Sequence, residues 1–369
     1  MSRPFIDFYH QIGFAPTGQQ RELSLAHSKN RDNLYRKLGL HDALFKGANI
    51  LEIGPGSGEN SLDILSRGVE SLTLIDAVPV ILESIKTRVD NDQRVKFEIA
   101  DLSSSTPNEL FDLVVCEGVI PNQLNPASFL RNVAAGVKPG GLIMITTMDE
   151  ISLLSEILRR FLAHTVFEVR IQNTDQIVEF FQSDFSSLPG MTRNQRDWVL
   201  DVIHNPWVGN LFSVSEACLA LQPNYRPIAL TPNLFADLSW YKNALSVLEE
   251  SENWISKFNS VQHLLIDSRI NVLTTSSDSL NETLRYYCLK VVDLVKQYIA
   301  QDIENPRQEL LTLLESLLSE CPQIAPQTKN SLFAYCSWLN SGDLGQLKDF
   351  RALWGRGQQH IVFQNSQTG

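Results

Sequence analysis

Residues 49–58 read Asn-Ile-Leu-Glu-Ile-Gly-Pro-Gly-Ser-Gly, an apolar run that passes directly into glycines at every second position. The apolar run predicts a buried β-strand. Gly54, Gly56 and Gly58 have no Cβ atom, so a ligand can lie against the main chain where the next helix begins. We interpret this stretch as a nucleoside-binding turn.

The spacing of the glycines distinguishes two kinds of nucleotide site. A dinucleotide fingerprint, Gly-x-Gly-x-x-Gly, would need its third glycine at position 59, which is Glu59. The pattern is instead Glu-x-Gly-x-Gly-x-Gly, and its Glu52 is placed to accept a hydrogen bond from a cationic amine. This pattern resembles motif I of the class I S-adenosylmethionine-dependent methyltransferases. The resemblance implies S-adenosyl-L-methionine as the cofactor, bound in part by Glu52, Gly54, Pro55, Gly56, Ser57 and Gly58.

The resemblance covers residues 46–150, where strand-like and helix-like segments alternate as in βαβ units. Strands are expected at 50–53, 72–75, 95–99, 113–116 and 142–146, and Lys-Pro-Gly-Gly at 138–141 is expected to form the turn into the last of these. The implied fold class is α/β, a Rossmann-like sheet of seven strands with helices on both faces and a large, mostly helical insertion.

Acidic residues follow three of these strands, at the edge where ligands bind in open parallel sheets. Asp76 can accept both hydroxyl protons of a ribose, Asp101 can accept the exocyclic amine of adenine, and Glu117 faces the cleft. A single strand-end acid is more often a helix cap or a solvated turn residue, and Asp112 is our choice for such a structural acid. Their order predicts further cofactor contacts from Asp76, Ala77, Asp101, Leu102, Glu117 and Gly118.

The flanking segments divide the chain into six parts. Residues 1–45 are expected to form an N-terminal lid or helical leader, from which Tyr9 contacts the cofactor and His27 and Arg31 face the site. The other expected parts are the core at 46–164, a helical insertion at 165–211, the sixth strand within 212–232, a helical substrate or cap region at 233–353, and a return to the core at 354–369. Residues 360–364 would supply the seventh strand, the alternative being a frayed tail.

Methyl transfer from a sulfonium is an in-line displacement that depends mainly on holding donor and acceptor close and aligned. An alcohol or ammonium acceptor needs a base, whereas a carboxylate acceptor needs none. The candidate catalytic residues are Glu117 and His27, with His164 and His204 as weaker alternatives for the base. The helical insertion is expected to form the acceptor pocket. Its Trp240, Tyr241, Tyr286 and Tyr287 can contribute aromatic walls, although core packing is the expected role for most of them.

Composition limits the partners. The net charge of −11 argues against nucleic acid, and the Asp/Asn-Pro-Pro-Tyr loop of enzymes that methylate nucleic-acid amines is absent. The dispersed cysteines predict neither a metal site nor disulfides and favour a cytoplasmic location, and no apolar run is long enough to cross a membrane. We therefore expect a small-molecule or peptide-like acceptor, methylated on oxygen in preference to nitrogen. A catalytically silent scaffold and an aminopropyltransferase-like enzyme are the alternatives, although the second lacks its expected pair of aspartates.

Overall fold

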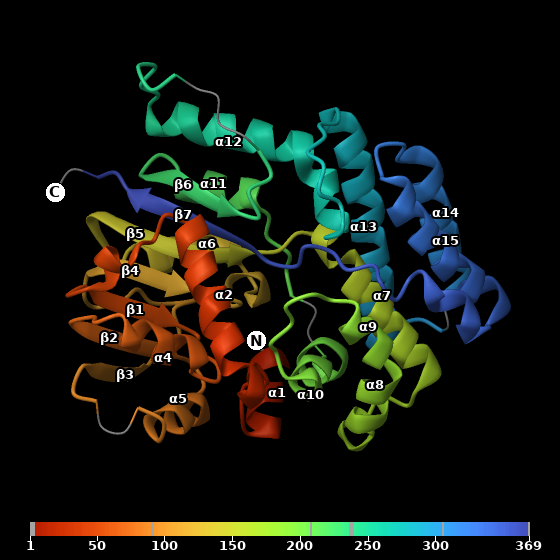
Figure 1. Ribbon diagram of the computed structural model, residues 1–369, viewed down its shortest axis with the longest axis horizontal. Helices are drawn as coiled ribbons and strands as arrows, with labels where there is room; N and C mark the ends of the chain where they lie inside the picture. The colour runs from red at the N-terminus through yellow and green to blue at the C-terminus, as the bar shows by residue number, and fades with distance from the viewer. Residues whose placement is uncertain (1–3, 90–91, 207–208, 236–239, 305, 368–369) are drawn as a thin grey trace.

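The computed structural model describes residues 4–89, 92–206, 209–235, 240–304 and 306–367, and its centre is one seven-stranded sheet (Figure 1). The order across the sheet is β3-β2-β1-β4-β5-β7-β6. The strands are β1 Asn49–Ile53, β2 Ser71–Asp76, β3 Val95–Ile99, β4 Phe111–Cys116, β5 Val137–Thr147, β6 Tyr225–Thr231 and β7 Gln359–Asn365. The predicted α/β fold with a seven-stranded sheet is confirmed. Residues 1–3 of the predicted leader lie outside the described residues.

The last strand of the chain lies inside the sheet. β7 pairs antiparallel with β5 on one side and with β6 on the other, whereas β1 to β5 pair in parallel. Ile361, Val362 and Phe363 are each at most 1% exposed, because both faces of β7 are covered. The strand predicted at 360–364 is therefore present. The division of the chain into six functional parts stays a prediction.

Neighbouring residues of each central strand pack into different cores, one on each face of the sheet. Ile50 belongs to the core that includes Tyr35, whereas Leu51 belongs to the core that includes Phe129. This alternation follows from the two-residue period of a strand, and it explains why β1 is apolar at successive positions. The first core is covered by α2 Ser24–Lys37, α4 Glu59–Ser66 and α5 Pro79–Lys86, and the second by α6 Pro126–Ala134, α7 Glu150–Val166 and α11 Val214–Leu221.

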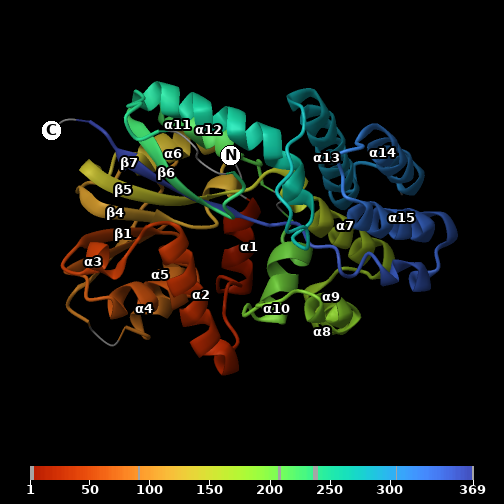
Figure 2. The same cartoon turned by 45° about the horizontal axis from the view of Figure 1, so that its top comes forward.

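Most of the remaining helices gather on one side of the sheet, around α7 (Figures 1 and 2). They are α8 Thr174–Phe180, α9 Gln182–Ser186, α10 Gln195–Trp198, α13 Asp278–Ile299, α14 Arg307–Glu320 and α15 Pro326–Ser341, while α12 Val247–Val261 packs on β6 and α11. The leader contains α1 Pro4–Ile12, and α3 Asp42–Phe45 precedes β1. Shorter turns are a π-helical turn at Val199–His204 and 3-10 turns at Arg21–Leu23, Ile120–Asn122, Ile171–Asn173, Gln262–Ile266 and Leu344–Lys348. Among the described helices, none is both long enough and apolar enough to cross a lipid bilayer.

The turn expected at residues 138–141 lies within β5 instead of before it. Phe111 of β4 pairs with Val137 and Leu113 pairs with Leu142, so the extra residues form a bulge in the strand. Asp112 lies beside this bulge, where its carboxylate accepts hydrogen bonds from the Lys138 Nζ atom at 2.7 Å and the Asn49 backbone nitrogen at 2.8 Å. The structural role predicted for Asp112 is confirmed.

Candidate active site

The turn after β1 requires its glycines. Gly54 and Gly56 have φ angles of +67° and +57°, in the left-handed region that residues with a Cβ atom rarely adopt. A Cβ atom on Gly56 would also lie 2.6 Å from the Thr17 hydroxyl oxygen, and one on Gly54 would overlap the Val119 side chain. Because the glycines carry no side chains, the main chain of this turn is accessible along one wall of a cavity.

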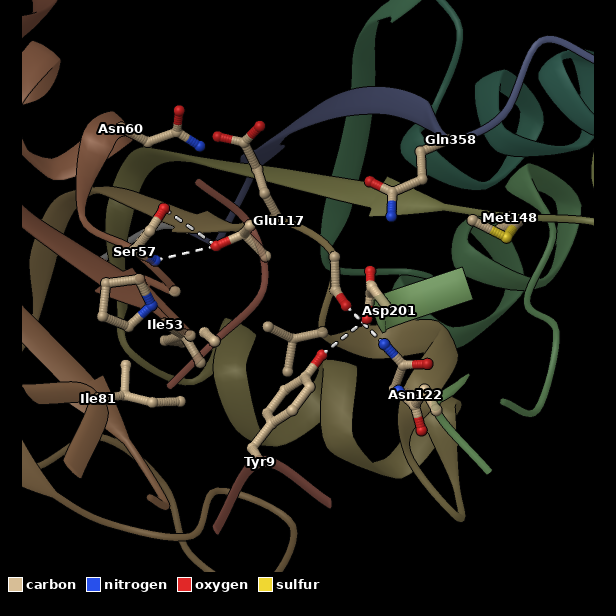
Figure 3. Close-up of a pocket in the computed structure, with 18 of the residues that line it drawn as sticks. Tyr9, Ile53, Ser57, Asn60, Ile81, Glu117, Asn122, Met148, Asp201 and Gln358 are labelled. Atoms are coloured by element: carbon tan, nitrogen blue, oxygen red, sulfur yellow. Dashed lines mark hydrogen bonds between the residues drawn. The ribbon is translucent and has the colours of Figure 1, made fainter. Parts of the chain in front are cut away.

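That cavity has a volume of about 580 Å³ and opens at the carboxyl ends of β1, β2 and β4 (Figure 3). Its lining includes the predicted residues Glu52, Gly54, Pro55, Gly56, Ser57, Asp76, Ala77, Asp101, Leu102, Glu117, Gly118 and Tyr9. Gly58 does not line it, since this residue is the buried N-cap of α4. Apolar Val78 and Ile81 complete the part of the wall next to Asp76.

Two of the strand-end acids also serve their own turns. One oxygen of Asp76 accepts from the Val78 backbone nitrogen at 2.8 Å, and one oxygen of Asp101 accepts from the Ser103 backbone nitrogen at 3.0 Å. Burial raises the pKa of Asp76 to about 6. Each carboxylate thus stabilises its own turn and also lies in the cavity wall, where it can accept hydrogen bonds from a ligand.

Glu52 is more deeply buried, at 3% exposure, and accepts a hydrogen bond from the Ser61 hydroxyl at 2.5 Å. Burial raises the pKa of this carboxyl to about 7. A cationic ligand group beside it would favour the ionised form and so would bind more tightly as Glu52 loses its proton. The geometry is compatible with the amine contact predicted for Glu52.

Glu117 is held by two basic residues from distant parts of the chain. Arg31 of α2 donates to both carboxylate oxygens, at 2.7 and 2.8 Å, and the His360 Nε2 atom of β7 lies 3.2 Å from one of them. Burial by itself would raise the pKa of Glu117, but the charge of Arg31 and the hydrogen bonds from His360 and Arg31 outweigh it and place the pKa well below its usual range. Glu117 therefore stays ionised and is a poor proton acceptor. Sequence reasoning missed His360, because nothing near it in the chain marks it.

The leader closes over the cavity through polar contacts on both sides. Thr17 accepts from the Ser57 backbone nitrogen at 2.9 Å, next to the glycine turn. On the other side, the Tyr9 hydroxyl donates to Asp201 at 3.1 Å, and Arg193 pairs with the second oxygen of Asp201 at 2.7 Å (Figure 3). Tyr9 is thus joined to the wall opposite the glycine turn, and Arg193 and Asp201 are site residues that the sequence did not reveal.

The opposite half of the cavity is formed by α7, by residues 188–205 and by the segment before β7. Its lining includes Met148, Leu153, Glu156, Ile157, Arg160, Leu188, Met191, Trp198, Val202, Asn205, Trp354 and Gln358. Within the described ranges, no residue of 233–353 lines it. The aromatic walls expected from Trp240, Tyr241, Tyr286 and Tyr287 are therefore wrong for this cavity. The first three of these side chains are more than half exposed.

The histidines considered as bases lie outside this lining. His27 is on α2, where burial and the nearby Arg31 charge lower its pKa. Burial is also the main cause that lowers the pKa of His164 and of His204 to about 4. All three histidines lie in the described part of the chain, and none of them lines the cavity. The catalytic role predicted for His27 therefore finds no support in its position.

Residues 23–186 match a family of proteins described as a methyltransferase domain. A ubiquinone biosynthesis O-methyltransferase, mitochondrial, from Schizosaccharomyces pombe is 28% identical over 170 residues, which are 44% of this chain and 60% of that protein. A ubiquinone biosynthesis O-methyltransferase from Xanthomonas campestris is 31% identical over 108 residues, 28% of this chain and 44% of that protein. The chain thus spans about half the length of the curated relatives it matches.

Among solved structures, the N-methyltransferase NodS from Bradyrhizobium japonicum in complex with S-adenosyl-L-homocysteine aligns with a TM-score of 0.30 at 20% identity. The alignment covers 34% of this chain and 62% of NodS.

Proposed function

We propose that this protein is a class I S-adenosylmethionine-dependent methyltransferase that transfers a methyl group to an oxygen, or a nitrogen, of a small-molecule or peptide-like metabolite. S-adenosyl-L-methionine is the proposed cofactor. The observation that carries the proposal is a single cavity that joins the glycine turn and strand-end acids to a second, largely apolar half on α7 and residues 188–205. Such a cavity can hold a nucleoside donor and an acceptor at the same time.

The residues of the first half suit this cofactor. Asp76 is placed for the ribose hydroxyls and Asp101 for the adenine amine, while Val78 and Leu102 supply apolar surface for the base. Glu52 lies at the turn that would receive the amino group. When bound, the cofactor supplies an electrophilic methyl group on a sulfonium. The backbone of Gly54 and Gly56 allows close approach without steric overlap.

The protein's own contribution is orientation and exclusion of water. Tyr9 and Thr17 tie the leader to opposite walls, so the leader covers the cavity between them. Glu117 is held as a fixed negative charge by Arg31 and His360, which favours a positioning role over proton transfer. Where the acceptor must lose a proton, Glu156 is the better candidate base, because it lines the acceptor half and burial raises its pKa. Holding the reacting groups aligned accounts for most of the acceleration expected.

Isothermal titration calorimetry tests this proposal directly. S-adenosylmethionine and S-adenosylhomocysteine should both bind with a stoichiometry of one. If the folded protein binds neither ligand, the methyltransferase proposal fails and the catalytically silent scaffold is the remaining alternative. Tighter binding of decarboxylated S-adenosylmethionine than of either would favour the aminopropyltransferase-like alternative.

Replacing Asp76 by alanine should weaken the binding of S-adenosylhomocysteine by about 1.5–3 kcal/mol, because the ribose would lose hydrogen bonds to a charged acceptor. Calorimetry on the purified variant measures this change. Asp112→Ala is the matched control. Asp112 is also an aspartate on a strand of the sheet, but it contacts Lys138 and Asn49 outside the cavity. Equal affinities for the wild type and the Asp76 variant would remove Asp76 from the ribose site.

Cofactor binding should also depend on pH. The pKa of Asp76 is raised to about 6, so the carboxylate becomes protonated as the pH falls through this value. A ligand that prefers the ionised form must displace that proton, and affinity for S-adenosylhomocysteine should therefore fall between pH 7 and pH 5. Glu52, with its pKa near 7, adds to the fall. Titrations of Asp76→Asn over the same range isolate the Asp76 part, which the variant should lack.

A further inference from the structure

Arg160 is a buried cation in the acceptor half of the cavity. It lies on α7, lines the cavity and is 4% exposed. One Nη atom donates to the backbone oxygen of Asn205, but the Nε atom is buried and has no hydrogen-bond partner. Among the described residues, no carboxylate forms an ion pair with this guanidinium. An unpaired buried charge costs several kcal/mol, so its retention at a cavity wall points to a partner that arrives with the ligand.

Two acids, Glu156 and Asp201, line the same half of the cavity, but neither forms an ion pair with Arg160. His164, His204 and Lys296 are the titratable groups whose pKa values its charge lowers, and all three are basic. Asp201 is the acid near enough to influence Arg160, but its two oxygens already bind Tyr9 and Arg193. In the described part of the chain, Arg160 is thus left with an Nε–H group that has no hydrogen-bond acceptor.

We propose that the acceptor carries a carboxylate on an apolar body, and that Arg160 binds this carboxylate as an anchor. This inference rests on the methyl transfer proposed above, since it takes the ligand of this half of the cavity to be the methyl acceptor. Trp198, Ile157, Leu188 and Met191 line the same half of the cavity and would contact the apolar body. A flat carboxylate matches the fork of one guanidinium and carries a single negative charge, so Glu156 and Asp201 in the same cavity repel it less than they would repel a phosphate dianion.

The anchor is separate from the atom that is methylated. Arg160 lies ten residues after Glu150, where α7 begins directly behind β5, and ten helical residues span roughly 15 Å. The backbone nitrogen of Gly118 donates to the Thr146 hydroxyl of β5 at 2.7 Å, so Glu117 and Gly118, where we place the transferred methyl group, lie near the start of α7. The methylated oxygen or nitrogen would then be carried on the apolar body, away from the carboxylate.

The test uses hexanoate, 3-phenylpropanoate and 5-phenylpentanoate, each against its uncharged primary amide, with full-length protein saturated with S-adenosylhomocysteine. Calorimetry should find at least one acid that binds at least tenfold more tightly than its amide. Arg160→Gln should abolish this preference and Arg160→Lys should keep part of it. Arg170→Gln, which removes an exposed arginine paired with Glu168, is the control and should leave the preference unchanged.

Three results would overturn the proposal. The first is that the wild type binds every acid no more tightly than its amide, or binds neither. The second is that Arg160→Gln keeps the full preference for the acid over the amide. The third is that phenyl phosphate binds more tightly than the acids. If Arg160→Gln does not fold, the acid and amide comparison on the wild type decides. S-adenosylhomocysteine affinity should be the same in wild type and Arg160→Gln. If the wild type does not bind S-adenosylhomocysteine, the proposed function fails. The comparison of acids with amides, carried out without S-adenosylhomocysteine, then still decides the role of Arg160.

Discussion

Deletion of residues 354–369 should abolish the folded state. The deletion removes β7, which lies between β5 and β6, so β6 would lose its strand partner and β5 would gain an open edge. Ile361, Val362 and Phe363 are almost fully buried, and burying side chains of this size contributes about 1.5–3 kcal/mol each. Their sum of about 5–9 kcal/mol is comparable with the total stability of a typical domain, about 5–15 kcal/mol. Soluble yield, circular dichroism and thermal unfolding would measure the effect.

A milder change in the same strand gives a graded result. Phe363→Ala should lower the free energy of unfolding by about 3–5 kcal/mol, because it leaves a cavity at a fully buried position. Deletion of residues 367–369 alone removes chain beyond β7 and should leave stability unchanged within about 0.5 kcal/mol. A soluble protein that lacks residues 354–369 and still binds S-adenosylhomocysteine would contradict the central role of β7.

Asp184→Ala should destabilise the protein by about 3–5 kcal/mol, because it leaves a buried arginine without its partner. Asp184 and Arg159 are at most 1% exposed, and the Arg159 Nε atom donates to Asp184 at 2.9 Å. Arg351 donates to the other oxygen of Asp184 at 2.6 Å, and the Arg159 guanidinium stacks 3.7 Å from the Trp354 ring centre. Urea unfolding followed by fluorescence would measure the loss.

An exposed ion pair supplies the control for this experiment. Asp175 pairs with Arg196, but its side chain is 83% exposed, so Asp175→Ala should cost less than about 1 kcal/mol. The double variant Arg159→Met with Asp184→Leu should be more stable than Asp184→Ala, since it removes both charges together. A loss below 1 kcal/mol for Asp184→Ala would show that water or a rearranged side chain replaces the carboxylate.

Local patterns were sufficient for the first half of the sheet and for the cavity lining next to the glycine turn. Glu52 could be identified because it lies near the end of β1, and Asp76 and Asp101 because they lie at the ends of β2 and β3, since strand ends in a parallel sheet meet at one edge. The turn expected at residues 138–141 was misplaced because a bulge lets β5 continue through its glycines.

The acceptor side could not be predicted in the same way. The prediction of an aromatic wall from Trp240, Tyr241 and Tyr286 depended on residue type alone. Their side chains are exposed and do not line the cavity. The residues that do line it, such as Arg160 and Trp198, lie on helices whose sequence periodicity indicates a buried face without saying what that face meets.

The sequence by itself determined the glycine turn, the strand-end acids and the first strands of the sheet, because each depends on residues within a few positions of one another. Only the tertiary structure decided how Glu117 is used, since Arg31 and His360 reach it across 86 and 243 positions of the chain. The same holds for the unpaired charge of Arg160. Whether a charge is buried, paired or free depends on which distant segments pack around it, and no local pattern records that packing.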